Sequence, residues 1–424
     1  MKRTLPDGFV GAVMAVDSIT DAVSFLHGPG GCRVRPMLHS AAFPRMPLEE
    51  SDKAFMPYFF GYPRVPATFL DEYDYINGAY YKLKESLPIV NMRRPSLTVI
   101  LNSPGAGLIG DNQEKAIIES GMEGRAIWLD ESFVSIPVTE GYDRTLSGIM
   151  RHLDPERTGV EKDSVIILGM TIMDKAWDAA IDEIRENLGA MGLRVICTPG
   201  AKTNTAELNG SVNAEYAVIV CPETCATLSE YYESKGVKII RSPAGAPVGF
   251  NAMESWYRNI AEATGKDPSV PIGKIAKAKK WAYTRFVGVK YNALRIKGQT
   301  FSVAGIGSVV RPLTEWLYRY LALAPVAVDV DPGSDPDNVD ALKGFLESVD
   351  FADSFGIEPK KGSSIVLCEG ITALIMKTNR ECNVGIPIGM SLMDIDDVIP
   401  RPVYGLHGVL YILDEILHGA REGR

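Results

Sequence analysis

A cysteine at the end of a glycine-rich turn is the first feature of this sequence that could do chemistry. Residues 26–32 read Leu-His-Gly-Pro-Gly-Gly-Cys and close an apolar run over residues 22–26. Glycine lets the backbone approach a bulky group closely and can adopt a positive φ, so Cys32 can reach a group that sits against the main chain. A strand-to-helix turn with a buried thiol explains the same residues, because free cysteine is among the most buried residue types.

A second glycine-rich turn lies further along the chain. Residues 97–101 form an apolar, β-branched run that leads into Asn-Ser-Pro-Gly-Ala-Gly at 102–107 and Gly-Asp-Asn at 110–112. This order predicts a strand, a turn and a helix, with Ser103 directly after the strand.

Together the two turns resemble those of the nitrogenase component 1 superfamily, which has a His-Gly-Pro-x-Gly-Cys turn followed by a Cys-Pro-x-Gly-Leu-Ile-Gly-Asp-Asp turn. That superfamily includes nitrogenase molybdenum-iron protein subunits, cofactor-assembly scaffolds, dark-operative protochlorophyllide reductase and the nickel-tetrapyrrole reductive cyclase. The resemblance implies a homodimer, or a heterodimer with a related subunit, that shares an iron-sulfur cluster at its interface. It also implies an ATP-dependent iron protein as the electron donor.

The resemblance assigns cluster ligands only in part. Related subunits give up to three cysteines each; here Cys32 matches one, Ser103 stands at another, and the early element reads Asp-Gly-Phe-Val-Gly at 7–11 without a cysteine. A nitrogenase-type eight-iron cluster is therefore not expected. The expected cofactor is a 4Fe-4S cluster shared between two subunits, with Cys32 as a metal ligand. Cluster ligation needs about four ligands, so Ser103, a carboxylate such as Asp111, a non-protein group or the partner would supply the others.

The resemblance also allows a comparison with the active-site cofactor of nitrogenase, which is bound by one cysteine and one histidine. Cys221 stands where that cysteine would be. The histidine-containing run is replaced by Met-Ser-Leu-Met-Asp at 390–394, so an iron-molybdenum cofactor held in the nitrogenase manner is not expected.

Two cysteines share a local pattern that does not depend on the resemblance. Cys221 and Cys368 each follow a buried strand and precede a helix. Open parallel sheets bind ligands at the carboxyl ends of their strands, and a helix N-terminus lowers a thiol pKa. Both are therefore candidate cofactor-binding residues facing a cleft between domains. The alternative, with equal weight, is that both cysteines are simply small residues of the hydrophobic core.

Three successive cycles of strands and helices must position these residues. Strands are predicted at 97–101, 126–129, 165–168, 193–197, 217–220, 301–304, 326–330, 365–367 and 385–388, and helices at 74–87, 174–188, 275–296, 309–323 and 404–417. Residues 10–70 read as turn-rich, with an irregular surface segment at 43–62. The predicted fold is α/β, with three Rossmann-like domains of mainly parallel sheets flanked by helices, at 1–158, 159–268 and 269–424.

Composition and missing motifs exclude several classes of protein. The chain has 424 residues, a net charge of −9 and no long Lys/Arg block, so nucleic acid is not an expected partner. It has no run of about 18 apolar residues and no signal peptide pattern, and its six cysteines are dispersed, so a cytoplasmic protein with reduced thiols is expected. Gly-x-Gly-x-x-Val at 305–310 lacks the third glycine of a dinucleotide fingerprint. Walker, Ser-His-Asp, HExxH and EF-hand motifs are absent, so ATP would bind a partner.

The resemblance therefore implies a nitrogenase-like oxidoreductase component that accepts electrons from an iron-sulfur ATPase and reduces an unidentified substrate. The missing cluster ligands favour a non-catalytic scaffold or carrier for a metallocofactor precursor as the alternative. A cluster-free protein of the same fold that binds a small molecule is a third hypothesis. Tetrapyrroles, small unsaturated molecules and organosulfur compounds are all candidate substrates, because specificity depends on cleft shape.

Overall fold

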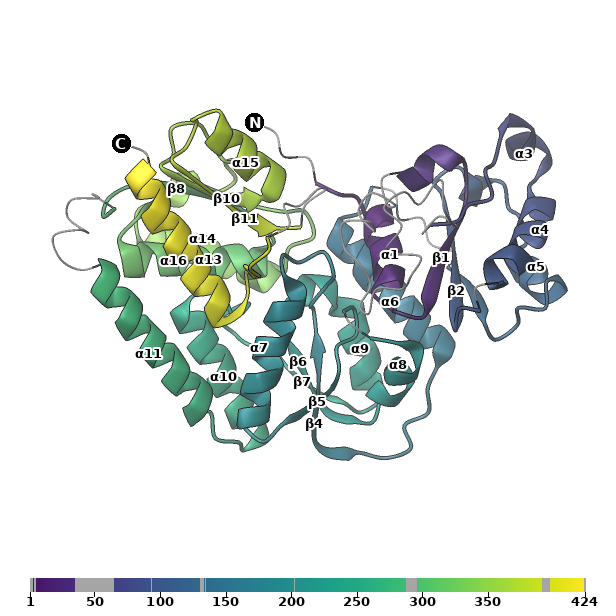
Figure 1. The fold of residues 1–424 in the computed structure, drawn as a ribbon, viewed down its shortest axis with the longest axis horizontal. Helices are drawn as coiled ribbons and strands as arrows, with labels where there is room; N and C mark the ends of the chain where they lie inside the picture. The colour runs from purple at the N-terminus through teal and green to yellow at the C-terminus, as the bar shows by residue number, and fades with distance from the viewer. Residues whose placement is uncertain are drawn as a thin grey trace.

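Three all-parallel sheets, each in its own lobe, make up the molecule (Figure 1). The computed structural model describes residues 3, 5–34, 65–92, 94–129, 133, 135–201, 203–286, 296–390 and 397–422. The predicted irregular segment at 43–62 lies outside these residues, as does 391–394 of the run that replaces the histidine. The α/β fold class is confirmed.

The first sheet contains β1 (Ala22–His27), β2 (Leu97–Asn102) and β3 (Ala126–Leu129) in that order. One face packs on α4 (Tyr80–Asn91) and α5 (Gln113–Glu119), and the other on α1 (Gly8–Asp17). Alternate strand residues point to opposite faces, so Phe25 faces α4 and α5 while Leu26 faces α1.

Two predictions for this lobe were wrong. The turn-rich region contains α1, whose ten residues are all buried, so it shows no polar face from which a helix could be recognised. The predicted helix at 74–87 is instead two helices, α3 (Glu72–Asn77) and α4. Gly78 separates them with a φ of 86°, a left-handed conformation that favours glycine.

The second sheet has the order β5-β4-β6-β7, with β4 (Glu161–Leu168), β5 (Arg194–Cys197), β6 (Ala214–Ile219) and β7 (Lys238–Ile240). Its helices are α7 (Trp177–Ala190), α8 (Thr205–Ser211), α9 (Ala226–Ser234) and α10 (Phe250–Thr264). The predicted strands and the helix after β4 are confirmed, with shifted ends.

The third sheet has the order β11-β10-β8-β9, with β8 (Thr300–Gly305), β9 (Ala324–Val330), β10 (Ile365–Glu369) and β11 (Val384–Gly389). Its helices are α13 (Gly307–Leu321), α14 (Pro336–Ser348), α15 (Gly370–Thr378) and α16 (Gly405–Glu422). The bridging helix α11 (Ser269–Phe286) begins before its predicted start at 275. Residues 287–295 of that prediction lie outside the described part.

Helix α6 (Val138–Leu153) connects the first two lobes by packing against both α1 and α9. The crossing with α1 is close because glycines meet there: a Cβ on Gly141 would lie 2.0 Å from the Gly8 carbonyl oxygen. The domain limits at 158 and 268 stay a prediction.

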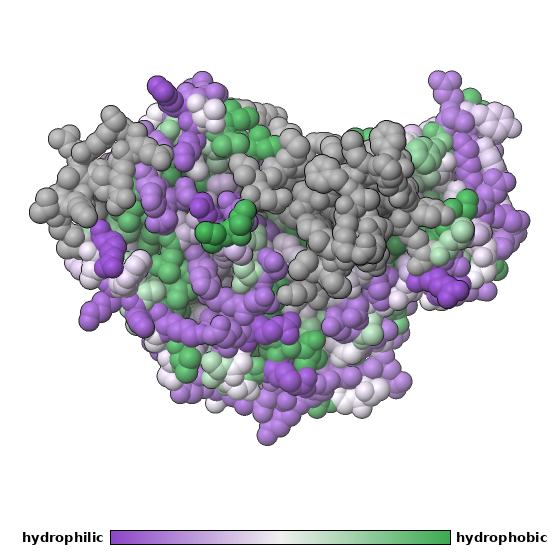
Figure 2. Space-filling model, viewed as in Figure 1, coloured by the Kyte–Doolittle hydropathy of each residue, from purple (hydrophilic) through white to green (hydrophobic). Residues whose placement is uncertain are grey.

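On the face of the molecule shown in Figure 2, hydrophilic residues are interspersed with small patches of hydrophobic residues. Among the described residues, no helix is both long and apolar enough to cross a bilayer.

Candidate functional site

The two glycine-rich turns lie side by side at one edge of the first sheet. Strands β1 and β2 pair so that His27 is opposite Asn102, and the Ser103 N–H donates to the His27 carbonyl at 2.9 Å. A Cβ on Gly28 would lie 2.5 Å from both Cβ and Oγ of Ser103. The glycines at 28, 30 and 31 have no positive φ, so Gly28 is required for close approach and not for a left-handed turn.

His27 fixes the relative position of the two turns. Its buried ring lies 3.0 Å from Asp111 Oδ2 through Nε2 and 3.2 Å from Thr68 Oγ1 through Nδ1. Burial lowers the pKa of His27, although the Asp111 carboxylate opposes this shift. The Ala79 N–H donates to both Asp111 oxygens at 3.0 Å. Asp111 is therefore engaged in holding the turns, which competes with the ligand role the sequence left open for it.

Cys32 lies in a single 3₁₀ turn, η1 (Gly30–Arg33), directly after the first glycine-rich segment. Its side chain is half-buried, and burial raises the pKa of its thiol. The neighbouring Gly31 is exposed, and a Cβ there would meet nothing within 4 Å. The Cys32 side chain itself packs against the main apolar core cluster.

Ser103 carries a buried hydroxyl that has no hydrogen-bond partner among the described residues, and its exposed fraction is 1%. Buried polar atoms without a partner are uncommon and call for a ligand or another explanation. In the described part of the chain, no group of three or more His, Cys, Asp or Glu residues could hold a metal ion. One thiol and one hydroxyl fit a site shared between two chains, and they do not fit a four-iron cluster held by one chain.

Cys221 lies just beyond β6 and is completely buried. Its thiol donates to Glu223 Oε2 at 3.2 Å and accepts from Ser308 Oγ at 3.6 Å. Burial, with the Glu223 carboxylate beside it, raises the pKa of the thiol well above its ordinary value. The expectation of a lowered pKa was wrong because the thiol is completely buried and because η3 (Pro222–Thr224) places the Glu223 carboxylate beside it.

Cys368 is also buried, at the end of β10. Burial raises the pKa of its thiol, again contrary to expectation. It packs within an apolar cluster of Ala304, Val366, Ala373, Met376 and Cys382. The structure does not bring Cys368 together with Cys221 or Cys32 in a metal-binding group, and the assignment of Cys32, Ser103, Cys221 and Cys368 as cofactor-binding residues stays a prediction.

Glu223, which the sequence analysis did not single out, joins the second lobe to the third. Its Oε1 accepts from the Ser308 N–H at 2.8 Å and the Asp335 N–H at 3.2 Å, and its Oε2 accepts from Ser308 Oγ at 2.6 Å. Ser308 lies in the first turn of α13, where a helix attracts anions. The protein's own carboxylate therefore occupies the place that phosphate takes in a dinucleotide site, which agrees with the incomplete glycine fingerprint.

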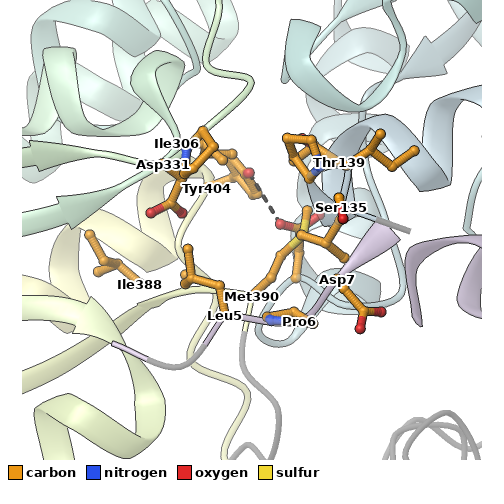
Figure 3. A pocket seen from close by; sticks show the side chains of 16 residues that line it. Leu5, Pro6, Asp7, Ser135, Thr139, Ile306, Asp331, Ile388, Met390 and Tyr404 are labelled. Carbon is orange, nitrogen blue, oxygen red and sulfur yellow. Dashed lines mark hydrogen bonds between the residues drawn. The ribbon is translucent and has the colours of Figure 1, made fainter. Parts of the chain in front are cut away.

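A cavity of about 290 Å³ lies where the second and third lobes meet α6 and the N-terminal segment. Strand ends of both sheets contribute to it: Asp174 follows β4, Ile306 follows β8, Asp331 follows β9 and Met390 follows β11 (Figure 3). The remaining lining residues are Leu5, Pro6, Asp7, Ser135, Ile136, Pro137, Val138, Thr139, Pro332, Ile388, Gly389 and Tyr404. Neither Cys221 nor Cys368 lines it.

Asp174 and Tyr404 form a buried polar pair in the cavity wall. The Tyr404 hydroxyl donates to Asp174 Oδ1 at 3.2 Å, while Oδ2 accepts from the Thr171 N–H at 2.8 Å and Oγ1 at 2.9 Å. Burial nevertheless raises the pKa of Asp174 to about 6. In the sequence, the signal for this pair was that Asp174 follows shortly after a buried strand, where open parallel sheets bind ligands.

Arg3 anchors the N-terminal segment that closes one side of the cavity. It pairs with Asp329 and Asp331 at 2.6 Å and with Glu358 at 2.9 Å. Burial raises the pKa of Asp331, and the Arg3 guanidinium opposes that shift. Leu5, Pro6 and Asp7 are thereby held in the cavity wall.

Replacing Asp174 by asparagine is expected to stabilise the protein above pH 7 by about 2 to 3 kcal/mol, as measured by urea unfolding. The native carboxyl retains its proton up to about pH 6, against 3.8 ordinarily, so its stabilising contribution is present below pH 4 and lost as the pH rises through 6. The difference between the two proteins should therefore disappear near pH 4. An equal difference at pH 4 and pH 8 would contradict the titration of Asp174.

The chain is similar to a known family and to solved structures. A sequence model of the family described as nitrogenase component 1 type oxidoreductase matches residues 8–419. The solved structure titled "Nitrogenase Cp1 at pH 6.5" is similar with a TM-score of 0.78 and 16% identity, covering 100% of this chain and 94% of that one. "Nitrogenase Cp1 at pH 5" gives 0.68 and 16%, covering 99% and 90%. No curated protein sequence matches the chain.

Proposed function

Because the chain belongs to the nitrogenase component 1 type oxidoreductase family, we propose that it is the electron-accepting component of a nitrogenase-like reductase. It pairs with a second copy of itself or with a related subunit, and it receives electrons from an ATP-dependent iron protein. All six cysteines are free, which agrees with a reducing compartment such as the cytoplasm.

The observation that carries this proposal is that Cys32 and the Ser103 hydroxyl, which has no hydrogen-bond partner among the described residues, lie on two neighbouring turns joined by the contact of His27 with Asp111. Cys32 would supply a thiolate and Ser103 an oxygen ligand to a 4Fe-4S cluster, and the partner subunit would complete the set. Such a cluster accepts and releases single electrons. The half-buried thiol has a raised pKa without metal, so metal binding would displace its proton.

The cavity between the lobes is the proposed substrate site. Asp174 holds a proton on a carboxyl oxygen up to about pH 6, and the Tyr404 hydroxyl orients that carboxyl. Reduction of an unsaturated bond consumes protons, and a buried acid in the wall of the cavity is placed to provide one.

Anaerobic purification followed by iron, sulfide and EPR analysis tests the cluster. Wild-type protein is expected to contain about four irons per pair of chains, and Cys32→Ala protein less than about a tenth of that, because loss of the only thiolate at the turn removes the anchoring ligand. Cys382→Ala is the matched control, since this thiol is buried in the third lobe. Unchanged iron content in the Cys32→Ala protein would contradict the proposed ligand.

A scaffold or carrier for a metallocofactor precursor is the second candidate function. It is favoured by the single cysteine at the cluster turns and by the absence of a complete metal-binding group in the described part of one chain. Substrate reduction that requires both the iron protein and ATP would establish the catalytic role. Bound metal that is transferred to another protein without turnover would establish the carrier role.

A further inference from the structure

The cavity contains one hydroxyl that no group in the described part of the chain satisfies. Thr139 has an exposed fraction of 2%, lines the cavity, and its Oγ1 has no hydrogen-bond partner among the described residues. An unmade hydrogen bond at a buried hydroxyl costs about 1 to 3 kcal/mol. A bound molecule that accepts a hydrogen bond from Thr139 would remove this cost.

The same corner of the cavity is the N-terminus of α6. Thr139 is the second residue of this 16-residue helix, and the cap residue Pro137 provides no side-chain hydrogen bond. The first N–H groups of a helix have no partner within the helix and carry partial positive charge. Both features therefore favour a hydrogen-bond acceptor on the ligand at this end.

The charged groups around the cavity are already engaged. Asp331 pairs with Arg3, Asp174 accepts from Thr171 and Tyr404, and Asp7 caps α1 by accepting from the Val10 N–H at 3.0 Å. A cationic group at the Thr139 corner would meet the positive end of α6, which disfavours it there. An anionic ligand would be repelled by the three carboxyl groups.

Size and lining limit the rest of the ligand. A cavity of about 150 Å³ lined by apolar side chains binds benzene, so about 290 Å³ accommodates a body up to about twice that size. Ile306, Ile388 and Met390 provide an apolar surface on the side away from Thr139 (Figure 3). A tetrapyrrole is too large for this space.

We propose that the cavity binds a compact, uncharged, mainly apolar molecule through one acceptor group, such as a carbonyl oxygen. This group accepts hydrogen bonds from the Thr139 hydroxyl and from N–H groups in the first turn of α6. This proposal rests on the proposed function, because it takes the cavity as the substrate site. It adds the chemical class of the substrate.

Three probes of matched shape test the ligand class: acetophenone, isopropylbenzene and benzoate, titrated separately into the protein as purified and followed by ligand-observed NMR. Acetophenone is expected to bind most tightly, isopropylbenzene more weakly because it lacks the acceptor, and benzoate most weakly because of its charge. Tighter binding of benzoate or isopropylbenzene, or no binding of acetophenone, would overturn the proposal.

A substitution then locates the contact. Thr139→Val keeps the side-chain shape and is expected to weaken acetophenone binding between about threefold and tenfold, the value of one hydrogen bond, while isopropylbenzene binding stays unchanged. Thr145→Val is the matched control, because this buried threonine of α6 donates to the Gly141 carbonyl and does not line the cavity. Equal effects of both substitutions on acetophenone would overturn the assignment.

The test of the ligand can be separated from the test of the iron-sulfur cluster. Cys32→Ala protein is expected to bind acetophenone as wild type does, because Cys32 does not line the cavity. If the wild-type protein binds acetophenone but contains no iron, the cluster proposal has failed. If it contains iron but does not bind acetophenone, the ligand proposal has failed.

Discussion

Replacing Gly141 by alanine is expected to destabilise the protein by about 3 kcal/mol or more, although alanine is normally the better helix former. The reason is the crossing of α6 with α1. A Cβ on Gly141 would lie 2.0 Å from the oxygen and 2.6 Å from the carbon of the Gly8 carbonyl group. Because these are backbone atoms, no side-chain rotation can relieve the clash, and α1 would have to move away from α6.

Guanidinium unfolding measures this effect, with Gly344→Ala as the matched control. Gly344 lies in the exposed face of α14, and a Cβ there meets nothing within 4 Å. The control substitution is therefore expected to stabilise the protein by up to about 1 kcal/mol. If Gly141→Ala also raised the unfolding midpoint, the close packing of α1 on α6 would be incorrect.

Replacing Glu223 by alanine is expected to cost about 3 to 5 kcal/mol. The carboxylate is only 7% exposed and accepts from the backbone N–H groups of Ser308 and Asp335 and from the Ser308 hydroxyl. Alanine would leave the two N–H groups without this acceptor and the Ser308 hydroxyl with only the Cys221 sulfur, and each lost hydrogen bond in such a setting costs about 1 to 3 kcal/mol, partly offset by relaxation. The substitution also removes the negative charge at the N-terminus of α13.

Glu223→Gln provides the comparison, because its amide oxygen can still accept from the two N–H groups. Its cost is expected to be about 1 to 2 kcal/mol, close to that of one charged hydrogen bond. Denaturant midpoints of the three proteins should therefore fall in the order wild type, glutamine, alanine. Equal midpoints for alanine and wild type would show that Glu223 does not hold the second and third lobes together.

Local patterns were sufficient to predict most of the strands and the fold class. Strands such as β2 and β6 are short apolar runs between turn residues, and every strand pair is parallel because helices connect successive strands. Local patterns failed in two places. Helix α1 is buried on all sides, so its sequence shows no alternation of polar and apolar faces. Gly78 ends α3 in a left-handed conformation, which hydrophobic periodicity does not report.

The two glycine-rich turns were also accessible from the sequence, since Ser103 directly follows a predicted strand and Cys32 ends the glycine-rich turn after the apolar run at 22–26. Parallel pairing of β1 with β2 places both turns at the same edge. The sequence did not reveal that His27 and Asp111 join them or that Ser103 lacks a partner, because those facts depend on contacts between residues distant in the chain.

The sequence by itself therefore determined the type of each lobe, the family resemblance and the position of the thiol that we propose as a cluster ligand. Only the tertiary structure decided that Cys221 faces Glu223 in a sealed interior, and that Asp174, Thr139 and Tyr404 line a common cavity. The physical reason is that hydrophobic periodicity reports burial one element at a time. A cavity, by contrast, is bounded by the strand ends, helix terminus and N-terminal segment that meet there, and their meeting depends on how the lobes pack.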